Sequence, residues 1–600
     1  MSELNDESPL RLAVDDVTAQ QWDQAAAAVL ARQKRPVDDP AQVWSALAGK
    51  TIDGLVIPPL GTAQRAEGHT LPVRSPGRAA GWDIRATVFD RDPDVASAAA
   101  VTELENGATS LWLTVGGSGV TPADLSAALR GVHLNMAPVV VSAGHGVTDR
   151  QAATALAAVV AAAPNGAAEG TNLGADPIGR LARSGDGPDP ADVADRISDV
   201  LTLAGDLGVR GFVADGTVAH DRGAGDVAEL AYAVATGVEY LRAFEAAGLD
   251  IDAALRMLDL RLTVTDEQFT SIAKLRAARV LWSRIGQLSG APDATATIHA
   301  VTSLPMTSRY DPWVNLLRTT VAAFAGGVGG ADAVTVLPFD IRLGVPDALG
   351  RRMARNISSL LIEESHVAAV ADAAAGAYAI EMLTHELAEA AWDRFLTIDG
   401  AGGVLAALGD GSLHAGWADT AARRRGQIAT RRRPLTGVSE FPNPAETLPA
   451  REPWLTPPEV AAWGEDFEVM RDEPVAGTVF LATLGPVAEH AARAGFVANL
   501  LAAGGVTARS AGRTETVQDV VAAYQGERVV LVVGTDTAYT DRGADAISAL
   551  RAAGAETIIV AGKPVPAVAD AVDDHVAAGQ DVVEFLRRVR AALAREVLGA

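Results

Sequence analysis

The region between about residues 80 and 340 constrains the fold most, because short strand-like runs alternate there with alanine-rich helical segments. Such alternation indicates parallel strands, since each helix returns the chain to the same end of the sheet. About eight strands of this kind predict a (β/α)₈ barrel. The strands are expected at 84–89, 111–115, 138–141, 170–173, 211–214, 258–264, 297–301 and 333–337. A doubly wound open sheet is the alternative, because periodicity alone does not separate the two folds.

Two long helices are also predicted, one within this region and one after it. Apolar residues recur at helical spacing along each, which is typical of a helix that packs one face on a core. These residues are Ile272, Leu275, Ala278, Leu281 and Ile285 in one helix, and Ile380, Leu383, Leu387 and Ala391 in the other.

A second α/β unit is predicted near the C-terminus. Strand-like runs at 479–483, 506–509, 529–534 and 557–561 alternate with helices, and a last helix covers about 581–594. This pattern predicts a doubly wound, flavodoxin-like domain. The carboxyl end of its first strand, at the loop 484–490, is where such a sheet places its ligand.

The expected domain organisation has four parts, which are an arm at 1–50, a barrel with following helices at 51–433, a linker at 434–475 and the C-terminal domain at 476–600. The arm has an apolar helical face, so we expect it to dock on its own barrel or on a partner. The linker is rich in proline, which restricts the chain. We expect Phe441, Trp454 and Trp463 to pin it to a surface.

Composition excludes several classes of site. None of the 600 residues is cysteine, so disulfides, thiolate nucleophiles and cysteine-based metal sites are ruled out. The net charge of −25 disfavours nucleic acid as a partner. The N-terminus is polar and acidic and does not resemble a signal peptide. The most membrane-like stretch, 155–163, is far shorter than the ~20 residues of a spanning helix. We therefore expect a cytoplasmic protein with no membrane contact.

Several stretches in a fixed order carry a family resemblance. They are LAY at 230–232, GVEYLR at 237–242, AKLRAARVLW at 273–282, RMARN at 352–356, EES at 363–365, GAY at 376–378, Glu381, LT at 383–384 and AW at 391–392. In order and spacing they resemble the methylmalonyl-CoA mutase family, from about residue 50 to the C-terminus. That family has a catalytic large subunit and a related small subunit. The segments 51–60 and 437–443 make this chain similar to the small one.

The resemblance implies a role in a radical reaction. In the family, adenosylcobalamin supplies the radical that interconverts (R)-methylmalonyl-CoA and succinyl-CoA, and the protein binds and shields the cofactor. The resemblance further implies a heterodimer in which the large subunit holds adenosylcobalamin and the acyl-CoA. This chain is then expected to contribute no catalytic residue and to bind no cofactor or metal itself.

Three departures from the catalytic pattern support that expectation. The family's catalytic loop carries Asp-x-His-x-x-Gly, whose His binds cobalt, whereas the loop here runs from Leu484 to His490 without an Asp-x-His pair. His490 is expected in the first helix, as an ordinary helix-start histidine rather than a ligand. Where the family has a His after Gly-Tyr to polarise the thioester, the matching residues here are Gly216-Thr217-Val218. His220 faces elsewhere if that segment is extended.

The third departure concerns an aromatic wedge that the family places near the cofactor. A Tyr provides it, but residues 80–92 contain only Trp82 and Phe89 as aromatic residues.

Two alternative functions stay open beside that of a non-catalytic subunit. One is an active mutase with a base-on cofactor or His490 as an unusual ligand. The other is a binding module that retains CoA in its barrel as a sensor.

Other signals favour structural roles. The glycine run 326–330 lies between a helix and a strand, the reverse of a phosphate-binding loop, and is interpreted as a turn. Six arginines between Arg423 and Arg433 could bind a CoA phosphate or a partner, but a basic helix docked on an acidic surface is favoured. Gly144-His145-Gly146 follows a strand at the expected ligand end, where a turn is favoured over a base. No Ser–His–Asp triad and no metal-ligand cluster is recognisable.

Overall fold

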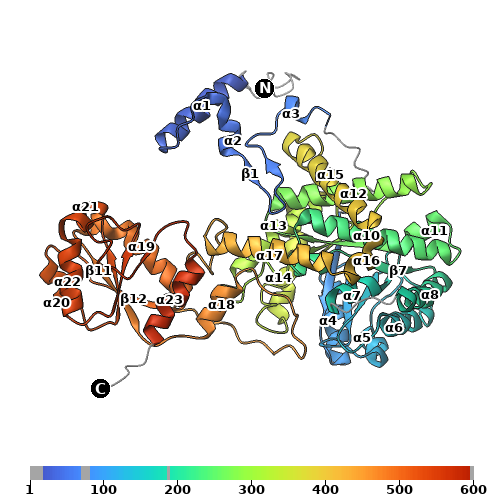
Figure 1. Cartoon of the computed structure of the whole chain (residues 1–600). Helices are drawn as coiled ribbons and strands as arrows, with labels where there is room; N and C mark the ends of the chain where they lie inside the picture. The colour runs from blue at the N-terminus through green and yellow to red at the C-terminus, as the bar shows by residue number, and fades with distance from the viewer. Residues whose placement is uncertain (1–17, 69–80, 185–189, 595–600) are drawn as a thin grey trace, which may run out of the picture.

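The computed structural model describes residues 18–68, 81–184 and 190–594. Its central unit is a closed barrel of eight parallel strands (Figure 1), so the open-sheet alternative is excluded. The strands are β3 (Asp83–Val88), β4 (Ser110–Val115), β5 (Val139–Ala143), β6 (Asn172–Ala175), β7 (Arg210–Asp215), β8 (Leu258–Val264), β9 (Ile298–Thr302) and β10 (Ala333–Thr335). They pair in chain order, and β10 closes on β3. The predicted (β/α)₈ fold is confirmed.

Three of the strands, β5, β6 and β9, begin later than predicted. β5 starts after Pro138, which has no backbone N–H to donate to a neighbouring strand. β6 starts after Gly170, which has a φ of 91° and belongs to the preceding turn. Buried strands such as β8 are covered on both sides, as expected for a parallel sheet enclosed by helices.

Helices surround the barrel and continue after it (Figure 1). Those between strands are α4 (Pro93–Glu105), α5 (Leu125–Ala128), α6 (Asp149–Ala161), α7 (Pro177–Ser184), α8 (Pro190–Leu207), α9 (Thr217–Asp221), α10 (Asp226–Ala246), α11 (Ile251–Arg256), α12 (Gln268–Leu288) and α13 (Val314–Val328). After β10 come α14 (Ala348–Ser359), α15 (Tyr378–Gly400), α16 (Gly403–Gly409) and α17 (Ser412–Ala429). Among the described residues, none of the helices has the length and apolar character needed to cross a membrane.

The two predicted apolar stripes lie on α12 and α15, and all of their residues are buried. The two helices pack against each other outside the barrel. A buried polar contact joins them, since Arg276 of α12 donates to Glu381 of α15 at 2.8 Å and also pairs with Asp372. These contacts hold the post-barrel helices against the barrel's outer layer.

The C-terminal sheet has five parallel strands in the order β12-β11-β13-β14-β15. They are β11 (Thr478–Thr483), β12 (Thr507–Ser510), β13 (Val529–Val533), β14 (Thr557–Ala561) and β15 (Asp574–Val576). The helices of this domain are α19 (Val487–Ala503), α20 (Val517–Ala523), α21 (Asp536–Ala538), α22 (Ala544–Ala552) and α23 (Val582–Ala594). The strand order is that of a flavodoxin-like fold, as predicted. The short, polar β15 was not predicted from the sequence.

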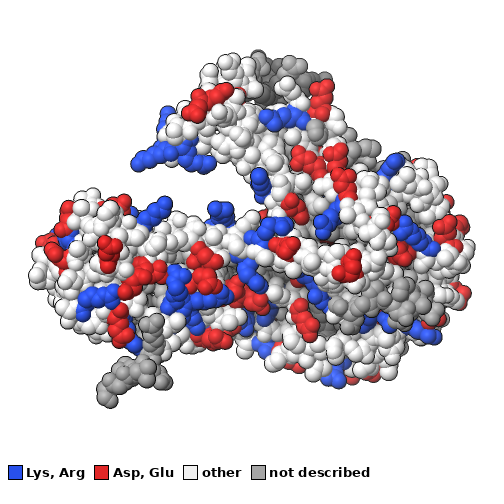
Figure 2. Space-filling model, in the orientation of Figure 1, with Lys and Arg blue, Asp and Glu red and all other residues white. Residues whose placement is uncertain are grey.

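The N-terminal arm stands away from the barrel, with α1 (Ala19–Arg32) projecting at the upper left of Figure 1. It is held by α2 (Val43–Leu47), where Trp22 and Trp44 pack with ring centroids 4.7 Å apart. Val29 is half exposed. Figure 2 shows open space between the arm and the C-terminal domain, so the outer face of α1 is not covered by this chain on that side.

The proline-rich linker runs over the barrel and includes α18 (Glu465–Asp472). Trp454 donates its indole N–H to the carbonyl of Ile341 at 3.1 Å, and the backbone N–H of Trp463 donates to Pro305 at 2.8 Å. The expectation that these two residues pin the linker is confirmed. Phe441 holds the linker through its backbone only, because its N–H donates to Asn499 of α19 at 2.9 Å while the residue is 77% exposed. Its φ is 53°.

Candidate functional site

A concavity with many polar side chains lies at the barrel's carboxyl-terminal mouth, where barrel enzymes place their ligands. It has a volume of about 540 Å³. Residues at the ends of successive strands line it, including Thr114, Ser142, Asp215 and Thr263. The linker segment 454–459, which we term the strap, lines the outer side of this mouth cavity. Ser118 fixes the strap through hydrogen bonds to both the N–H and the carbonyl of Thr456.

Two arginines and one aspartate form the charged centre of the mouth cavity. Asp215 accepts from Arg183 at 2.7 Å and from Arg261 at 3.1 Å. Burial would raise the pKa of Asp215, but the charges of Arg261 and Arg183 outweigh burial and hold that pKa below its ordinary value. The guanidinium of Arg261 lies 4.2 Å from the ring centroid of Trp112. Two guanidinium groups therefore share one ionised carboxylate at the floor of the cavity.

A second carboxyl group in the cavity behaves differently. Burial raises the pKa of Asp176 to about 7, and the Asp215 carboxylate adds to the rise, although Arg183 opposes it. Oδ1 of Asp176 accepts hydrogen bonds from the Tyr240 hydroxyl at 2.6 Å and from the Gly179 N–H at 3.0 Å. The environments of the two carboxyl groups therefore push their pKa values in opposite directions.

Side chains fill the barrel axis below the mouth. Arg210 donates to Asp259 at 2.6 Å, and the side-chain amide of Asn172 donates to the same carboxylate at 3.0 Å. Arg261 donates through Nε to His299, whose other ring nitrogen lies 2.7 Å from the hydroxyl of Thr335. These residues come from five successive strands, β6 to β10, and their hydrogen bonds join side chains of different strands. The axis is therefore a packed polar core and not a channel.

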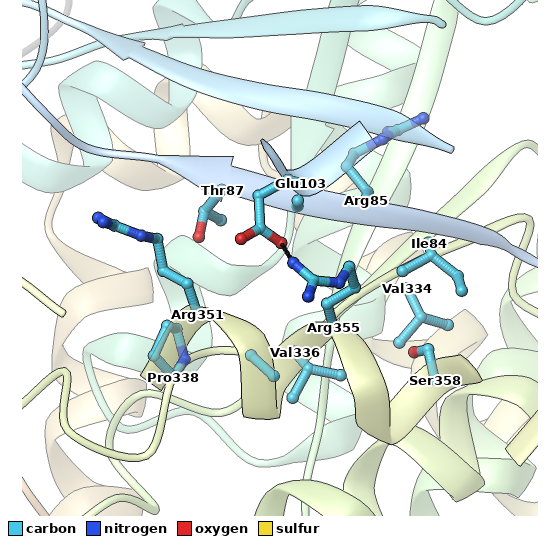
Figure 3. Close-up of a pocket in the computed structure, with 12 residues that line it drawn as sticks. Ile84, Arg85, Thr87, Glu103, Val334, Val336, Pro338, Arg351, Arg355 and Ser358 are labelled. Carbon is cyan, nitrogen blue, oxygen red and sulfur yellow. Dashed lines mark hydrogen bonds and ion pairs between the residues drawn. The ribbon is translucent and has the colours of Figure 1, made fainter. Parts of the chain in front are cut away.

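A second cavity lies in the barrel wall behind β3 (Figure 3). Glu103 of α4 and Arg355 of α14 point toward each other there and form a buried ion pair of 2.6 Å. The cavity holds about 20 Å³, which is room for roughly one water molecule. Arg355 belongs to the RMARN run at 352–356, so part of that motif is explained by helix packing against the barrel wall.

The loop after β11 has the geometry of a closed turn. Leu484 is buried, Gly485 has a φ of 94°, and α19 begins at Val487. His490 lies within α19, as predicted, and is 4% exposed. It is the fourth residue of the helix, and its Nδ1 atom is buried without a hydrogen-bond partner among the described residues.

The crevice between β11 and β13 is filled from the side by Arg493. This residue donates to the carbonyl of Gly534 at 2.6 Å and to Asp536 at 2.6 Å. Beneath it, the Tyr539 hydroxyl donates to Ala561 at 2.7 Å and accepts from the Gly534 N–H at 3.0 Å. The usual ligand position of a doubly wound sheet is therefore occupied by the chain's own side chains.

The segment around Val218 is not extended but forms the short helix α9. The chain turns immediately after β7, where the Asp215 side chain accepts from the Thr217 N–H at 3.1 Å, so the condition under which the orientation of His220 was predicted is not met. Val218 is buried. His220 is also buried, and its Nε2 atom lies 2.8 Å from the hydroxyl of Ser303, which itself lines the mouth cavity.

The pairing of His220 with Ser303 was not foreseen, because 83 residues separate them in sequence. Glu229 lies 3.6 Å from the other ring nitrogen of His220, which is longer than a hydrogen bond. Lys274 holds the Glu229 carboxylate at 2.8 Å. Burial lowers the pKa of His220 well below its ordinary value, and the charge of Lys274 lowers it further. The three groups form a buried polar cluster whose carboxylate is engaged by a lysine, and not a nucleophilic triad.

The remaining residues that the sequence singled out lie in packing contacts or line the mouth cavity. Trp82 is buried and donates to Ser358 at 3.3 Å. Phe89 lines the mouth cavity and packs edge-on against Trp454 of the strap, with centroids 5.4 Å apart. His145 also lines the cavity rim and is exposed. The glycine run 326–330 is a turn only in part, because residues 326–328 are the last residues of α13 and only Gly329 and Gly330 lie in the turn that leads to β10. Gly327 lies against the Trp82 ring so closely that a Cβ would clash.

The arginine cluster between Arg423 and Arg433 contacts the chain itself. Arg424 is buried and donates to the carbonyls of Gly223 and Ala224. Arg425 pairs with Asp466 at 3.4 Å, Arg433 pairs with Glu267 at 2.7 Å, and Arg431 pairs with Glu440. These contacts favour the interpretation of a basic helix docked on acidic groups. Within the described ranges, no group of three or more His, Asp or Glu residues is arranged to hold a metal ion.

Comparison with known proteins places these features in a family. The family model described as methylmalonyl-CoA mutase matches residues 109–461. A methylmalonyl-CoA mutase small subunit from Streptomyces virginiae is 41% identical, covering 95% of this chain and 96% of that protein. A probable small subunit from Mycobacterium tuberculosis is 39% identical, covering 94% and 96%. The small subunit from Propionibacterium freudenreichii subsp. shermanii is 33% identical, covering 95% and 94%.

Proposed function

The chain belongs to the methylmalonyl-CoA mutase family, and from this premise we propose that it is the small, non-catalytic subunit of a cytoplasmic heterodimer. In this proposal a large subunit carries adenosylcobalamin and the acyl-CoA. The assembled enzyme interconverts (R)-methylmalonyl-CoA and succinyl-CoA. The cofactor supplies the radical chemistry, and the small subunit contributes stability and an interaction surface.

The observation that carries the proposal is the filled barrel axis. A CoA ester that reached the mouth along the axis would need the space taken by Arg210, Asn172 and Asp259, which hydrogen bond to one another. Displacing them would leave buried charged groups without partners, at a cost of several kcal/mol. This argues against the reading in which the barrel retains CoA as a sensor.

The residues of the C-terminal domain do not fit adenosylcobalamin. The loop after β11 offers no His–carboxylate pair to ligate cobalt, and His490 is buried within α19. Arg493 and Tyr539 close the crevice where a flavodoxin-like sheet would admit a ligand. We therefore assign to the residues of this chain no part in a reaction step on cobalamin.

The proposal is tested by purifying the chain with and without a large subunit. Alone, it is expected to show no corrin absorption in the visible range after incubation with adenosylcobalamin, and no mutase turnover. Co-expressed with a large subunit that carries Asp-x-His-x-x-Gly, it is expected to co-elute in a one-to-one complex that is active. Stoichiometric cobalamin on the isolated chain would refute the proposal.

The active-mutase alternative makes a different prediction for the same sample. Turnover by the isolated chain that is lost in His490→Ala would favour it over the structural role. The CoA-sensor alternative is tested by calorimetry with CoA, where an absence of heat at millimolar ligand would remove it.

A further inference from the structure

The side of α13 that faces away from the barrel is apolar. Trp313, which precedes the helix, is 50% exposed, and Leu317 is 68% exposed. Val321 and Phe324 are partly exposed. These four residues recur every three or four positions, so they lie on one side of the helix. A helix that covers a barrel normally turns polar residues to water on that side.

The one charged residue of α13 does not interrupt this apolar side. Arg318 is 7% exposed and points inward, where it donates to the side chain of Asn315 at 2.8 Å and to the carbonyl of Thr436 at 2.7 Å. Along the described length of α13, no charged side chain therefore reaches solvent. The barrel helix α4 has the usual pattern, with Asp94 and Glu105 exposed.

An exposed aromatic residue of the neighbouring helix extends this surface. Phe269, in the first turn of α12, is 60% exposed. Ile272, on the same side of α12, belongs to a buried cluster against which Phe324 of α13 packs. Large exposed apolar patches mark contacts with other proteins. We term the following residues the apolar face: Phe269, Trp313, Leu317, Val321 and Phe324.

The segment 51–60, one of the two that resemble the small subunit, lies near the start of α12. Asp53 accepts from the backbone N–H of Val227 in the first turn of α10 at 3.3 Å. The same turn is joined to α12, because Asp226 pairs with Lys274 at 2.8 Å. The exposed apolar residues of the segment are Val56 and Leu60.

The other segment that resembles the small subunit, 437–443, lies near the start of α13. Gly437 approaches Asp311 so closely that a Cβ on the glycine would lie 2.5 Å from that side chain, and Asp311 is two residues before Trp313. Phe441 of this segment is 77% exposed. The segments by which the chain resembles a small subunit therefore border the apolar face at the starts of both helices.

We propose that the apolar face is the surface on which the large subunit docks, through an apolar surface of its own. This inference rests on the proposed function and assigns the partner's contact to particular residues. The cores of protein interfaces are rich in aromatic residues and poor in charged ones, as this face is. A second copy of the chain is a less suitable occupant, because each copy carries a net charge of −25 and the two repel.

The test uses the double variant Phe269→Glu with Leu317→Glu in the full chain. Both side chains are largely exposed, so the isolated variant should keep the circular dichroism and melting temperature of wild type. In the complex, two carboxylates would be buried against apolar groups, which is unfavourable. Titration with a fluorescently labelled large subunit should show affinity reduced by about tenfold or more.

Two further variants control for charge and position. Leu288→Glu alters a 60% exposed leucine at the other end of α12, about 28 Å from Phe269 at 1.5 Å per residue, and should bind like wild type. Leu317→Arg introduces the opposite charge and should weaken binding as much as Leu317→Glu, because burial of either charge is unfavourable.

Oxidation by hydroxyl radicals provides a second measurement on the wild-type chain. Trp313 should be oxidised several-fold more slowly in the complex than in the isolated chain, because docking covers its ring. Met136, which is 74% exposed and outside the apolar face, should be oxidised equally in both samples.

The outcomes separate this inference from the proposed function. If wild type binds the large subunit and the double variant binds equally well, or if Trp313 is oxidised equally in both samples, only the docking surface is refuted. If wild type does not bind the large subunit, the proposed function fails and the docking surface with it. Self-association of the isolated chain that Leu317→Glu abolishes would assign the apolar face to a second copy and overturn the inference.

Discussion

At the scale of single residues, the chain keeps barrel charges in pairs that its own side chains satisfy. Asp215 is shared by two arginines, and Asp259 is bound by Arg210 and Asn172. Buried charges are tolerated only when they are compensated in this way.

Asp176 leads to a prediction about pH. Its folded-state pKa is raised to about 7 from an ordinary value of 3.8, so the fold prefers the protonated form. Stability contributed by this group is present at low pH and is lost as pH rises toward 7. Between pH 5 and 8, wild type should lose about 2 kcal/mol of unfolding free energy relative to Asp176→Asn. Urea unfolding at both pH values measures this difference.

The exposed Asp206 provides the control for that experiment. Asp206→Asn should follow wild type at both pH values, because its side chain is in solvent. A constant difference between wild type and Asp176→Asn from pH 5 to 8 would contradict the raised pKa.

At the scale of elements, the long apolar stripes were sufficient to predict that α12 and α15 are helices, because both helices bury their stripes in contacts with other elements. The stripes give each helix a buried face, but they do not say which helices meet. Arg276, Glu381 and Asp372 specify that contact through buried ion pairs. Hydrophobic periodicity does not reveal such ion pairs, because a charged residue in a helical sequence is normally assigned to the solvent-exposed face.

Breaking this contact should destabilise the whole barrel unit. Arg276→Ala leaves Glu381 buried without its cation, which should cost about 3–5 kcal/mol in unfolding free energy. Arg284→Ala, on the exposed face of the same helix, should change stability by less than about 0.5 kcal/mol. Chemical denaturation of the two variants compares them, and a similar loss in both would argue against the ion-pair role.

At the scale of the molecule, the linker couples two units that each have their own core. Trp463 packs against the core of the barrel and against one core of the C-terminal domain. Arg424 and Arg433 lie over its ring, at 5.3 and 4.6 Å from the centroid. One aromatic side chain thus ties the barrel, the arginine cluster and the flavodoxin-like domain together.

Removing that side chain should uncouple the two units. Trp463→Ala is expected to lower stability by about 3 kcal/mol and to separate thermal unfolding into two transitions. Differential scanning calorimetry measures both effects. Phe441→Ala, which alters an exposed aromatic residue of the same linker, is the control and should leave the trace unchanged. A single unshifted transition in Trp463→Ala would show that the domains are coupled elsewhere.

A further prediction at this scale concerns the N-terminal arm as a contact surface for a partner. Its helix α1 stands clear of the C-terminal domain, and Val29, Leu47 and Val56 are exposed apolar residues along it and the segment that follows (Figure 2). An uncovered apolar surface of this kind indicates a protein contact. Deletion of residues 1–48 should leave the chain folded by circular dichroism but weaken its co-elution with a large subunit. Unchanged co-elution would place the contact elsewhere.

The sequence by itself determined the two α/β units, their order and most strand positions, because hydrophobic periodicity and turn residues are local signals. The three departures at residues 484–490, 216–218 and 80–92 stay predictions, because they rest on the family resemblance and on the matching of positions that it implies. Only the tertiary structure decided that the barrel closes and that its axis is filled. It also paired His220 with Ser303 and brought Arg183, Arg261 and Asp215 together. The physical reason is that these contacts join residues from different strands, and long-range pairing leaves no periodic trace in the chain.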